Sequence, residues 1–482
     1  TQGGHHEKLL ELLIRNAEQH PAMVSYARLE QFYCALPEEE ILAHPALMQA
    51  RSTLSALRMD FEGSECWYRA LKQFAVGTGT PEQRLQAQSR VAWLDLALPQ
   101  RGTAELGRMI RAAAGYAESP TIQLPAFSVT NAMPSILNGG KDFSEASLRD
   151  LELYATLRQP LETLLGPAGV GLADCALAEC RFERGENVGA QLLQLMTGLS
   201  EVQQHGTADT EFALATLLAR WQLDRGEPGE AKRTMLSLRR RFVEQGQDRF
   251  LPNLDAALCR IALHMGDMEA VDNWYREKAP GDRMRPDVLK RYQYLTQAMA
   301  ELAQGRPDDA LLTLAPLEIF CTACHRYLDG LHRNVLRAIA LWRKKDGGWR
   351  ALLCAALETA ERYRFIRPVS LYGSAVLPLL GDCGWKGDQK YLAAVTAAAR
   401  EEAVFYPYYL TPGPDADVAL TAAEMQVLRL LCADRSNAEI GEILNIRLAT
   451  VKTHVSHVLQ KLGVSRRSEA RTAAQRLRLL NW

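Results

Sequence analysis

Apolar residues recur at steps of three and four along most of residues 1–408, and few segments alternate as a half-buried strand would. Between these helical patterns lie five glycines at intervals of 41, 40, 39 and 42 residues. Each can supply the left-handed residue that ends one helix, and the acidic residue or proline after it suits the start of the next. The spacing therefore predicts repeating helical hairpins. The five glycines are Gly185, Gly226, Gly266, Gly305 and Gly347.

A helical hairpin of this size cannot cover its own apolar face, whereas stacked neighbours can. We therefore expect an all-α chain whose body is a TPR-like helical-repeat solenoid. A further repeat is predicted around Gly63, between helices over Ala46–Phe61 and Glu65–Phe74. The alternative is a chance spacing, because 33 glycines in 482 residues is an ordinary content.

Two segments interrupt the helical pattern. Prolines and glycines are dense near residues 119–144, which predicts an irregular connector. Residues 409–417 hold two prolines and a glycine and are predicted to form a linker. The predicted organisation is a helical-repeat region over residues 1–408, a linker over 409–417 and a second domain over 418–482.

The second domain is predicted to contain four helices. Thr421 and Glu424 form a capping box before a first helix that ends near Cys432. Ser436 and Glu439 form another before a short helix that ends near Leu444. A third helix is expected over residues 448–462, and a fourth from a cap at residue 465 to about residue 480. A short helix, a tight turn and a longer basic helix are the parts of a helix-turn-helix.

The third helix divides into two faces. A periodic apolar stripe, predicted to be buried, consists of Val451, Val455, Val458, Leu459 and Leu462. Short polar and basic side chains lie off this stripe, as a helix that reads base edges in the major groove requires.

The base-reading candidates are Lys452, Thr453 and Ser456. The candidates for contacts to DNA phosphates are Thr450, His454, Arg447, Lys461, Arg466 and Arg467. The structural alternative is a small helical bundle with a solvated basic face.

The distribution of charge supports a DNA-binding helix-turn-helix over a bundle with a solvated basic face. The whole chain has a net charge of −1, but residues 418–482 carry ten Lys and Arg against five Asp and Glu. A basic module on an acidic body indicates a polyanionic partner at one end of the chain.

Residues 420–470 resemble the LuxR-type helix-turn-helix domain, which implies binding of double-stranded DNA, commonly as a homodimer, with the third helix in the major groove. By position, Lys452, Thr453 and Ser456 match the family's base-facing residues, and Thr450 and His454 match its backbone contacts. The chain departs from the family at Asp434, which replaces a Gly, at Gly441, which replaces an Ala, at Arg447, which replaces a capping Ser, and at Ser456, where Lys is common. The residues that carry the resemblance are Leu420, Thr421, Glu424, Val427, Leu428, Leu431, Ser436, Asn437, Glu439, Ile440, Leu444, Ile446, Thr450, Val451, Lys452, His454, Val455, Lys461, Leu462, Gly463, Val464, Arg467, Glu469 and Ala470.

The body resembles the helical sensor region of large ATP-dependent, maltose-regulator-like LuxR-type activators. Residues 35–39 and 45–47 look like the first hairpins after their ATPase, and residues 349–380 look like their last repeat. The phosphate-binding Gly-x-x-x-x-Gly-Lys-[Ser/Thr] pattern is absent, since residues 139–142 lack the first Gly and the hydroxyl. We expect a C-terminal portion of such a regulator, in agreement with the missing initiator Met.

Other chemical signals are weaker. Cys321-Thr-Ala-Cys324-His325 matches a haem-attachment pattern, but it lies inside a helical repeat of a chain without an export signal. Ten scattered cysteines indicate reduced thiols in a cytoplasm. No segment is apolar for long enough to cross a membrane, and no nucleophile, paired carboxylates or metal-ligand spacing points to catalysis. Four tryptophans within the repeats are expected in the core: Trp221, Trp274, Trp342 and Trp349.

The sequence therefore predicts a cytoplasmic, sequence-specific DNA-binding transcription regulator, expected to be an activator. Its solenoid would sense a small-molecule inducer or a regulatory protein, with RNA polymerase as a further partner. It is predicted to be no enzyme and to need no cofactor or metal ion in this chain. The alternative is a protein-interaction scaffold whose C-terminal domain serves dimerisation, and a haem protein is a third hypothesis.

Overall fold

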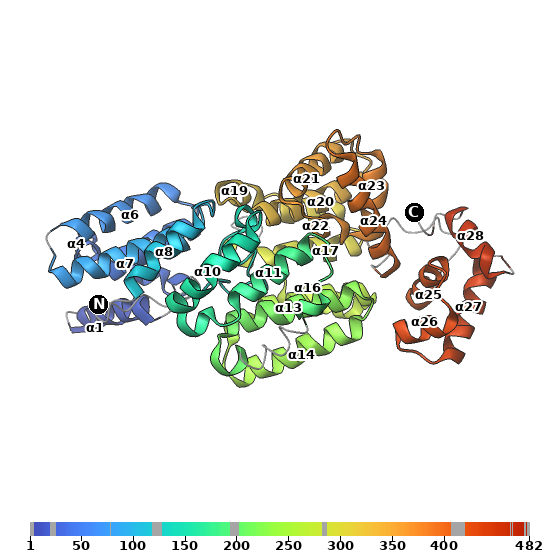
Figure 1. The fold of residues 1–482 in the computed structure, drawn as a ribbon, viewed down its shortest axis with the longest axis horizontal. Helices are drawn as coiled ribbons and strands as arrows, with labels where there is room; N and C mark the ends of the chain where they lie inside the picture. Colours follow the sequence, from blue (N-terminus) through green and yellow to red (C-terminus); the bar gives the residue numbers. More distant parts are fainter. Residues whose placement is uncertain are drawn as a thin grey trace.

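The structure is a computed structural model of the 482-residue chain. It describes residues 4–19, 26–77, 79–117, 128–192, 202–281, 287–405, 420–462, 464, 466–476 and 479. Helices dominate these residues, which contain no strand and only an isolated bridge between Asn138 and Asp142. The predicted all-α class is confirmed (Figure 1).

The N-terminal helices pack around a core of their own, which contains Leu13, Tyr33, Leu47 and Leu94. Helices of this length are marginal in water by themselves, so packing against their neighbours stabilises them. These helices are α1 (Gly4–Gln19), α3 (Glu30–Cys34), α4 (Glu38–Ala43), α5 (Pro45–Leu57), α6 (Phe61–Val76) and α7 (Pro81–Ala97). The next helix, α8 (Leu106–Ala117), packs against α7.

The repeat predicted around Gly63 exists as the hairpin of α5 and α6, but the turn is not at this glycine. Gly63 lies inside α6, and its N–H donates to Asp60 Oδ1 at 2.9 Å. The left-handed residue between the two helices is Met59, with φ of 61°. The prediction was wrong by four residues because Asp60, an N-cap residue, sets the start of α6.

The central repeats confirm the role predicted for four of the glycines. Gly185, Gly226, Gly266 and Gly305 have φ between 68° and 77°, and each follows the first helix of a hairpin. The hairpin helices are α11 (Leu172–Glu183), α13 (Ala208–Asp224) with α14 (Pro228–Glu244), α15 (Leu251–Met265) with α16 (Met268–Lys278), α17 (Arg291–Ala303) with α18 (Pro307–Leu314), and α20 (Tyr327–Arg343) with α21 (Trp349–Tyr363).

Gly347 is the exception, because its turn is closed two residues earlier. Lys345 holds the left-handed position with φ of 59°, and the N–H of Asp346 donates back to Leu341 O at 3.0 Å. Gly347 then lies in the approach to α21, where Asp346 Oδ1 accepts from Gly348 N at 2.9 Å. A second glycine and an aspartate allowed the chain to place its turn elsewhere.

An irregular segment, residues 128–143, runs against the repeats, as the connector prediction required. The earlier residues 119–127 of that prediction lie outside the described ranges. Gly139 fits where a Cβ atom would lie 2.7 Å from Ser135 O, so this part of the segment is closely packed. It leads to α9 (Ser144–Ser147), α10 (Asp150–Leu165) and the 3-10 turn η1 (Gly166–Gly169).

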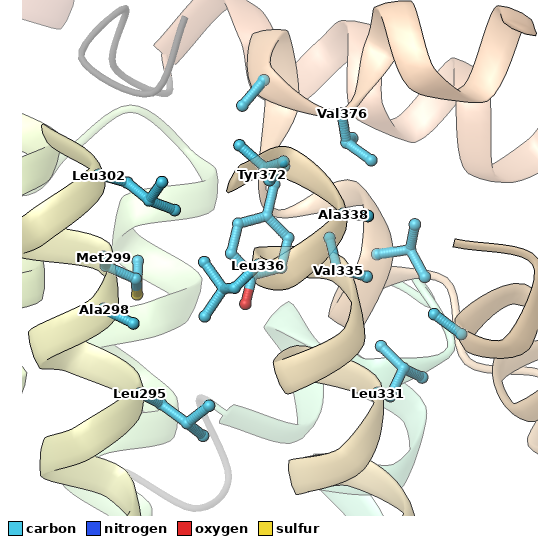
Figure 2. Packing of buried hydrophobic residues seen from close by; sticks show 14 of the residues in the cluster. Leu295, Ala298, Met299, Leu302, Leu331, Val335, Leu336, Ala338, Tyr372 and Val376 are labelled. Atoms are coloured by element: carbon cyan, nitrogen blue, oxygen red, sulfur yellow. The ribbon is translucent and has the colours of Figure 1, made fainter. Parts of the chain in front are cut away.

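The largest core joins successive repeats. Figure 2 shows Leu295, Met299 and Leu302 of α17 facing α20, which contributes Val335 and Leu336. Trp274 and Trp349 are buried and Trp221 and Trp342 are half-buried against the cores, as predicted. The remaining elements of this region are η2 (Asp248–Phe250), η3 (Val288–Lys290), α19 (Leu317–Ala323), α22 (Arg367–Ser370), η4 (Gly373–Ala375), α23 (Leu377–Asp382) and α24 (Gln389–Phe405).

The C-terminal domain has its own core, built on Leu428, Ile440, Val451 and Val458. The predicted linker, residues 409–417, lies outside the described residues. The first three helices have the predicted ends, but the fourth begins later than expected: a 3-10 turn precedes it, and α28 starts at residue 470. The elements are α25 (Ala422–Cys432), α26 (Asn437–Leu444), α27 (Leu448–Leu462), η6 (Arg467–Glu469) and α28 (Ala470–Arg476).

Candidate nucleic-acid interface

Both predicted capping boxes are formed. Glu424 N donates to Thr421 Oγ1 at 3.3 Å, and Thr421 N donates to Glu424 Oε2 at 2.7 Å. Ser436 and Glu439 repeat the arrangement with the same two distances. These local signals position the starts of α25 and α26, and hence the frame on which α27 is held.

The turn between α25 and α26 keeps a glycine-like conformation although Asp434 occupies it. Asp434 has φ of 59°, and its N–H donates to Leu431 O at 3.1 Å. Asn445, which ends α26, has the same left-handed conformation, with φ of 52°. Asp and Asn tolerate this conformation better than most residues, but Gly adopts it without steric cost.

Asp434→Gly is therefore expected to stabilise the C-terminal domain by about 0.5–1 kcal/mol, because it removes the strain of a left-handed non-glycine residue. The change in the free energy of unfolding is measured by denaturant titration of the full chain, with the unfolding transition of the C-terminal domain as the signal. Ala433→Gly is the matched control, since Ala433 has φ of −86° and should lose stability on substitution. A loss of stability in both variants would contradict the prediction.

The two faces of α27 are as predicted. Val451, Val458 and Leu462 are at most 2% exposed, and Val455 and Leu459 are half-buried. The three base-reading candidates, Lys452, Thr453 and Ser456, are all exposed. They lie within about 100° of one another around the helix, because each residue advances by about 100°.

The three side chains offer different chemistry. Lys452 presents an ammonium donor. The Thr453 hydroxyl donates to Ala449 O at 3.1 Å, so its oxygen remains as an acceptor and its methyl as an apolar contact. Ser456 offers a hydroxyl that can both donate and accept. Such a mixture can meet the donors, acceptors and methyl groups of base edges.

The predicted phosphate candidates differ in their surroundings. Thr450, Arg447 and Arg466 have exposed side chains, while His454 is half-buried with its Nδ1 atom enclosed. Lys461 Nζ donates to Glu424 Oε2 at 2.7 Å, and Arg467 Nη1 donates to Asn437 Oδ1 at 3.0 Å. Lys461 and Arg467 therefore also hold elements of the domain together.

Glu424 explains why Lys461 is held. Burial alone would raise the pKa of this carboxyl, but the hydrogen bonds from Lys461 and Thr421 outweigh burial and lower it. The ionised Glu424 thus ties the start of α25 to the end of α27. The sequence showed its capping role but not this ion pair, whose members are 37 residues apart.

Two arginines change the charge picture. Arg429 is 2% exposed, so it cannot contribute to the basic surface that the composition suggested. Arg435, which the sequence analysis did not select, is exposed, and its carbonyl accepts from Arg467 Nη2. Arg435 therefore adds a cation beside Arg467. Its position directly before the N-cap residue Ser436 could have identified Arg435 in the sequence.

The weaker motifs prove structural. Gly139 and Gly140 pack against backbone atoms, and Lys141 Nζ donates to Asp95 O at 2.9 Å in a buried position. Cys321 and Cys324 are buried in different cores, and burial raises the pKa of Cys324 to about 12. Enclosed thiols of this kind are poor haem-attachment sites.

In the described part of the chain, no group of three or more His, Cys, Asp or Glu side chains is arranged to hold a metal ion. No single described helix has the length and apolarity to cross a bilayer, although Asp150–Gly169 and Leu172–Glu183, bent by 101° at their junction, pass that test as a pair.

The fold and the exposed polar face of α27 define a DNA-binding transcription regulator built from helical repeats and a C-terminal helix-turn-helix. Residues 418–474 match the luxR family of bacterial regulatory proteins, and residues 167–383 match the MalT-like TPR region. The chain therefore contains a luxR-type DNA-binding domain and a MalT-like TPR region, as the resemblance implied.

Individual relatives agree with this class. The chain is 29% identical over 233 residues to the HTH-type transcriptional regulator MalT of Yersinia pestis (strain Pestoides F), covering 44% of this chain and 26% of the relative. It is 26% identical over 322 residues to MalT of Yersinia enterocolitica, covering 62% of this chain and 34% of the relative. The chain thus spans a quarter to a third of the length of these curated relatives.

Proposed function

We propose that this protein activates transcription as a sequence-specific DNA-binding dimer, with its helical repeats sensing an inducer or a partner protein. The observation that carries the proposal is the exposed face of α27, where Lys452, Thr453 and Ser456 stand beside one another on a domain with a buried core. The exposed residues Thr450, Arg447 and Arg466 would contact phosphates and set the register. RNA polymerase is the expected downstream partner, in a bacterial cytoplasm.

The arrangement supports this function through a division of labour. Phosphate contacts supply affinity that falls with salt, whereas contacts to base edges supply sequence preference. The ion pair between Glu424 and Lys461 ties α27 to α25, and the hydrogen bond from Arg467 to Asn437 ties η6 to α26. These contacts hold the helices of the domain in a fixed arrangement. A fixed helix loses little conformational entropy when it enters the groove.

Arg466→Ala is expected to lower affinity for all DNA sequences alike and to reduce the slope of log affinity against log salt by about 0.9, the value for one lost phosphate contact. Arg467→Ala should have the same effect and also destabilise the domain, because its contacts to Asn437 and Arg435 are lost. Mobility-shift titrations at several salt concentrations measure both effects. An unchanged slope for Arg466→Ala would contradict this assignment.

The function itself is tested by exposing the full chain to sheared genomic DNA and sequencing the retained fragments. A regulator should enrich a small set of sites that share a sequence. If the chain bound no DNA at any salt concentration but bound a protein partner tightly, the interaction scaffold would be favoured instead. Sedimentation with and without an enriched site tests the proposed dimer.

A contact between the two regions supports regulation of DNA binding by the repeats. The Cβ atom of Ala422 in α25 lies 3.6 Å from where a Cβ of Gly266 would stand. A small crevice beside it is lined by Leu223 and His264 of the repeats and by Leu430 and Ile443 of the C-terminal domain. Leu223 and His264 also line the main cavity of the repeats, so a change in that cavity would reach the domain contact directly.

A further inference from the structure

The repeats enclose a cavity of about 150 Å³ between the inner surfaces of their helices and the irregular segment at residues 133–138. A cavity of about this volume can hold a molecule about the size of benzene, so it suits a small organic molecule. Helices α11, α13, α15, α17, α20, α22 and α24 all contribute to its wall. Because so many helices line the cavity, a molecule bound there would contact most of the solenoid.

Most of the charged side chains in this wall are already paired. Arg220 Nη1 lies 2.6 Å from Glu183 Oε1, and Arg291 Nε lies 2.9 Å from Asp329 Oδ2. The Arg367 guanidinium pairs with two carboxylates, those of residues 224 and 402. These pairs offset their own burial cost and leave little charge for a ligand.

Arg260 differs from the other arginines of the cavity. Its Nε donates to Thr296 Oγ1 at 2.8 Å, its Nη2 donates to Tyr292 O at 3.2 Å, and its guanidinium lies 3.8 Å from the centre of the Tyr292 ring. Among the described residues, no carboxylate forms an ion pair with it, unlike Arg220 or Arg291. The guanidinium is thus held rigidly while its charge stays uncompensated, as an anion-binding group requires.

The same cavity holds buried oxygen atoms that lack a protein partner. Glu183 Oε2 and Thr216 Oγ1 are enclosed and make no hydrogen bond within the described structure, and both side chains are at most 5% exposed. A ligand that donates a hydrogen bond to this carboxylate oxygen would be favoured, because an unsatisfied buried acceptor is costly.

His332 connects the two features. It lies within electrostatic range of Glu183, Arg220 and Arg260, and its Nδ1 is 3.1 Å from the Tyr372 hydroxyl. Burial, reinforced by the nearby arginines, lowers the pKa of His332 to about 4, so it stays neutral at pH 7. His332 therefore adds no charge to this part of the cavity, and Arg260 is a cation of the wall that pairs with no carboxylate among the described residues.

We propose that this cavity binds a small carboxylic acid that also carries a hydroxyl or amino group. The carboxylate would lie against Arg260, and the hydroxyl or amine would donate to Glu183 Oε2. This assignment rests on the proposal that the repeats sense a ligand. An apolar ligand would leave Arg260 without a counter-ion and the buried acceptor of Glu183 without a donor, and an uncharged polyol would satisfy only the acceptor.

The test is calorimetric titration of the full chain, in the absence of DNA, with four sets of probes. D-glycerate and L-malate represent hydroxy acids, L-serine and L-glutamate represent amino acids, propionate and succinate lack the donor, and glycerol and D-glucose lack the charge. We expect at least one probe of the first two sets to bind more tightly than its donor-free or uncharged counterparts. Which of the two sets binds distinguishes a hydroxyl from an amine.

Arg260→Gln should weaken the binding of that probe by about 10- to 100-fold, the effect of losing a hydrogen bond to a charged group. Arg260→Lys, which keeps the charge, should bind more tightly than Arg260→Gln. Arg233→Gln is the matched control, since Arg233 is 67% exposed outside the cavity, and it should bind normally. Far-UV circular dichroism and melting temperature establish that each variant is folded.

The proposal is overturned if no acid of the first two sets binds, if the uncharged probes bind as tightly, or if Arg260→Gln binds normally. DNA binding, measured separately by mobility shift, tests the proposed function. If the chain binds an acid and this binding does not change its affinity for DNA, the proposed site stands and the proposed sensing role is wrong. A chain that binds DNA but no acid loses the site alone.

Discussion

Lys452→Ala is expected to weaken binding to the specific DNA site by about 1–3 kcal/mol and to relax the base preference at one position. The reason is that the exposed side chain of Lys452 lies about 100° around α27 from the buried Val451. From this position its ammonium group can donate to an acceptor on a base edge. Competition titrations against variants of a site enriched from genomic DNA measure the loss at each base pair. Thr453→Ala should cost a similar amount, through its acceptor oxygen and its methyl group.

A lysine outside the interface serves as the control for this prediction. Lys390 is also exposed but belongs to α24 in the repeats, and Lys390→Ala should leave both affinity and base preference unchanged. The interpretation of α27 as the reading helix would be wrong if Lys452→Ala and Thr453→Ala both bound the site like the parent chain. Circular dichroism of each variant excludes unfolding as the cause of a loss.

Asp329→Ala is expected to lower the free energy of unfolding of the repeat region by about 3–5 kcal/mol, because it leaves buried charges without a partner. Asp329 Oδ2 accepts from Arg291 Nε at 2.9 Å and from Arg326 Nε at 3.0 Å, and all three side chains are at most 4% exposed. Its Oδ1 accepts from Asn138 Nδ2 at 2.8 Å, which ties the irregular segment to α20.

Urea titration followed by circular dichroism measures this loss. Asp308→Ala is the matched control, because Asp308 is 73% exposed and its pair with Lys344 is solvated, so its loss should cost less than about 1 kcal/mol. Asp329→Asn keeps the oxygen that receives Asn138 and should cost less than Asp329→Ala. Equal stability of Asp329→Ala and Asp308→Ala would show that this charged cluster contributes little.

Features that depend on neighbouring residues were predictable from the chain. The capping boxes at Thr421 and Ser436 formed as expected, since cap and helix are only three residues apart. The left-handed turns at Gly226 and Gly266 followed from glycine's lack of a Cβ atom. The exposed side of α27 followed from the period of its valines.

Local prediction failed where two nearby residues could do the same task. Lys345 took the turn assigned to Gly347, and Asp60 moved the turn assigned to Gly63. In both places a non-glycine residue, Lys345 or Met59, adopts the left-handed conformation, so the spacing of glycines did not locate the turn.

The amino-acid order alone determined the helical repeats, the helix-turn-helix and the exposed polar face of α27, because these depend on periodicity and on contacts between residues close in the chain. The tertiary structure determines the partners of Lys461, Asp329 and Arg260, since each depends on residues that folding brings together from far apart in the chain. An arginine paired with a carboxylate and one left for a ligand look the same in the sequence. Only the burial and distances of the surrounding groups separate them.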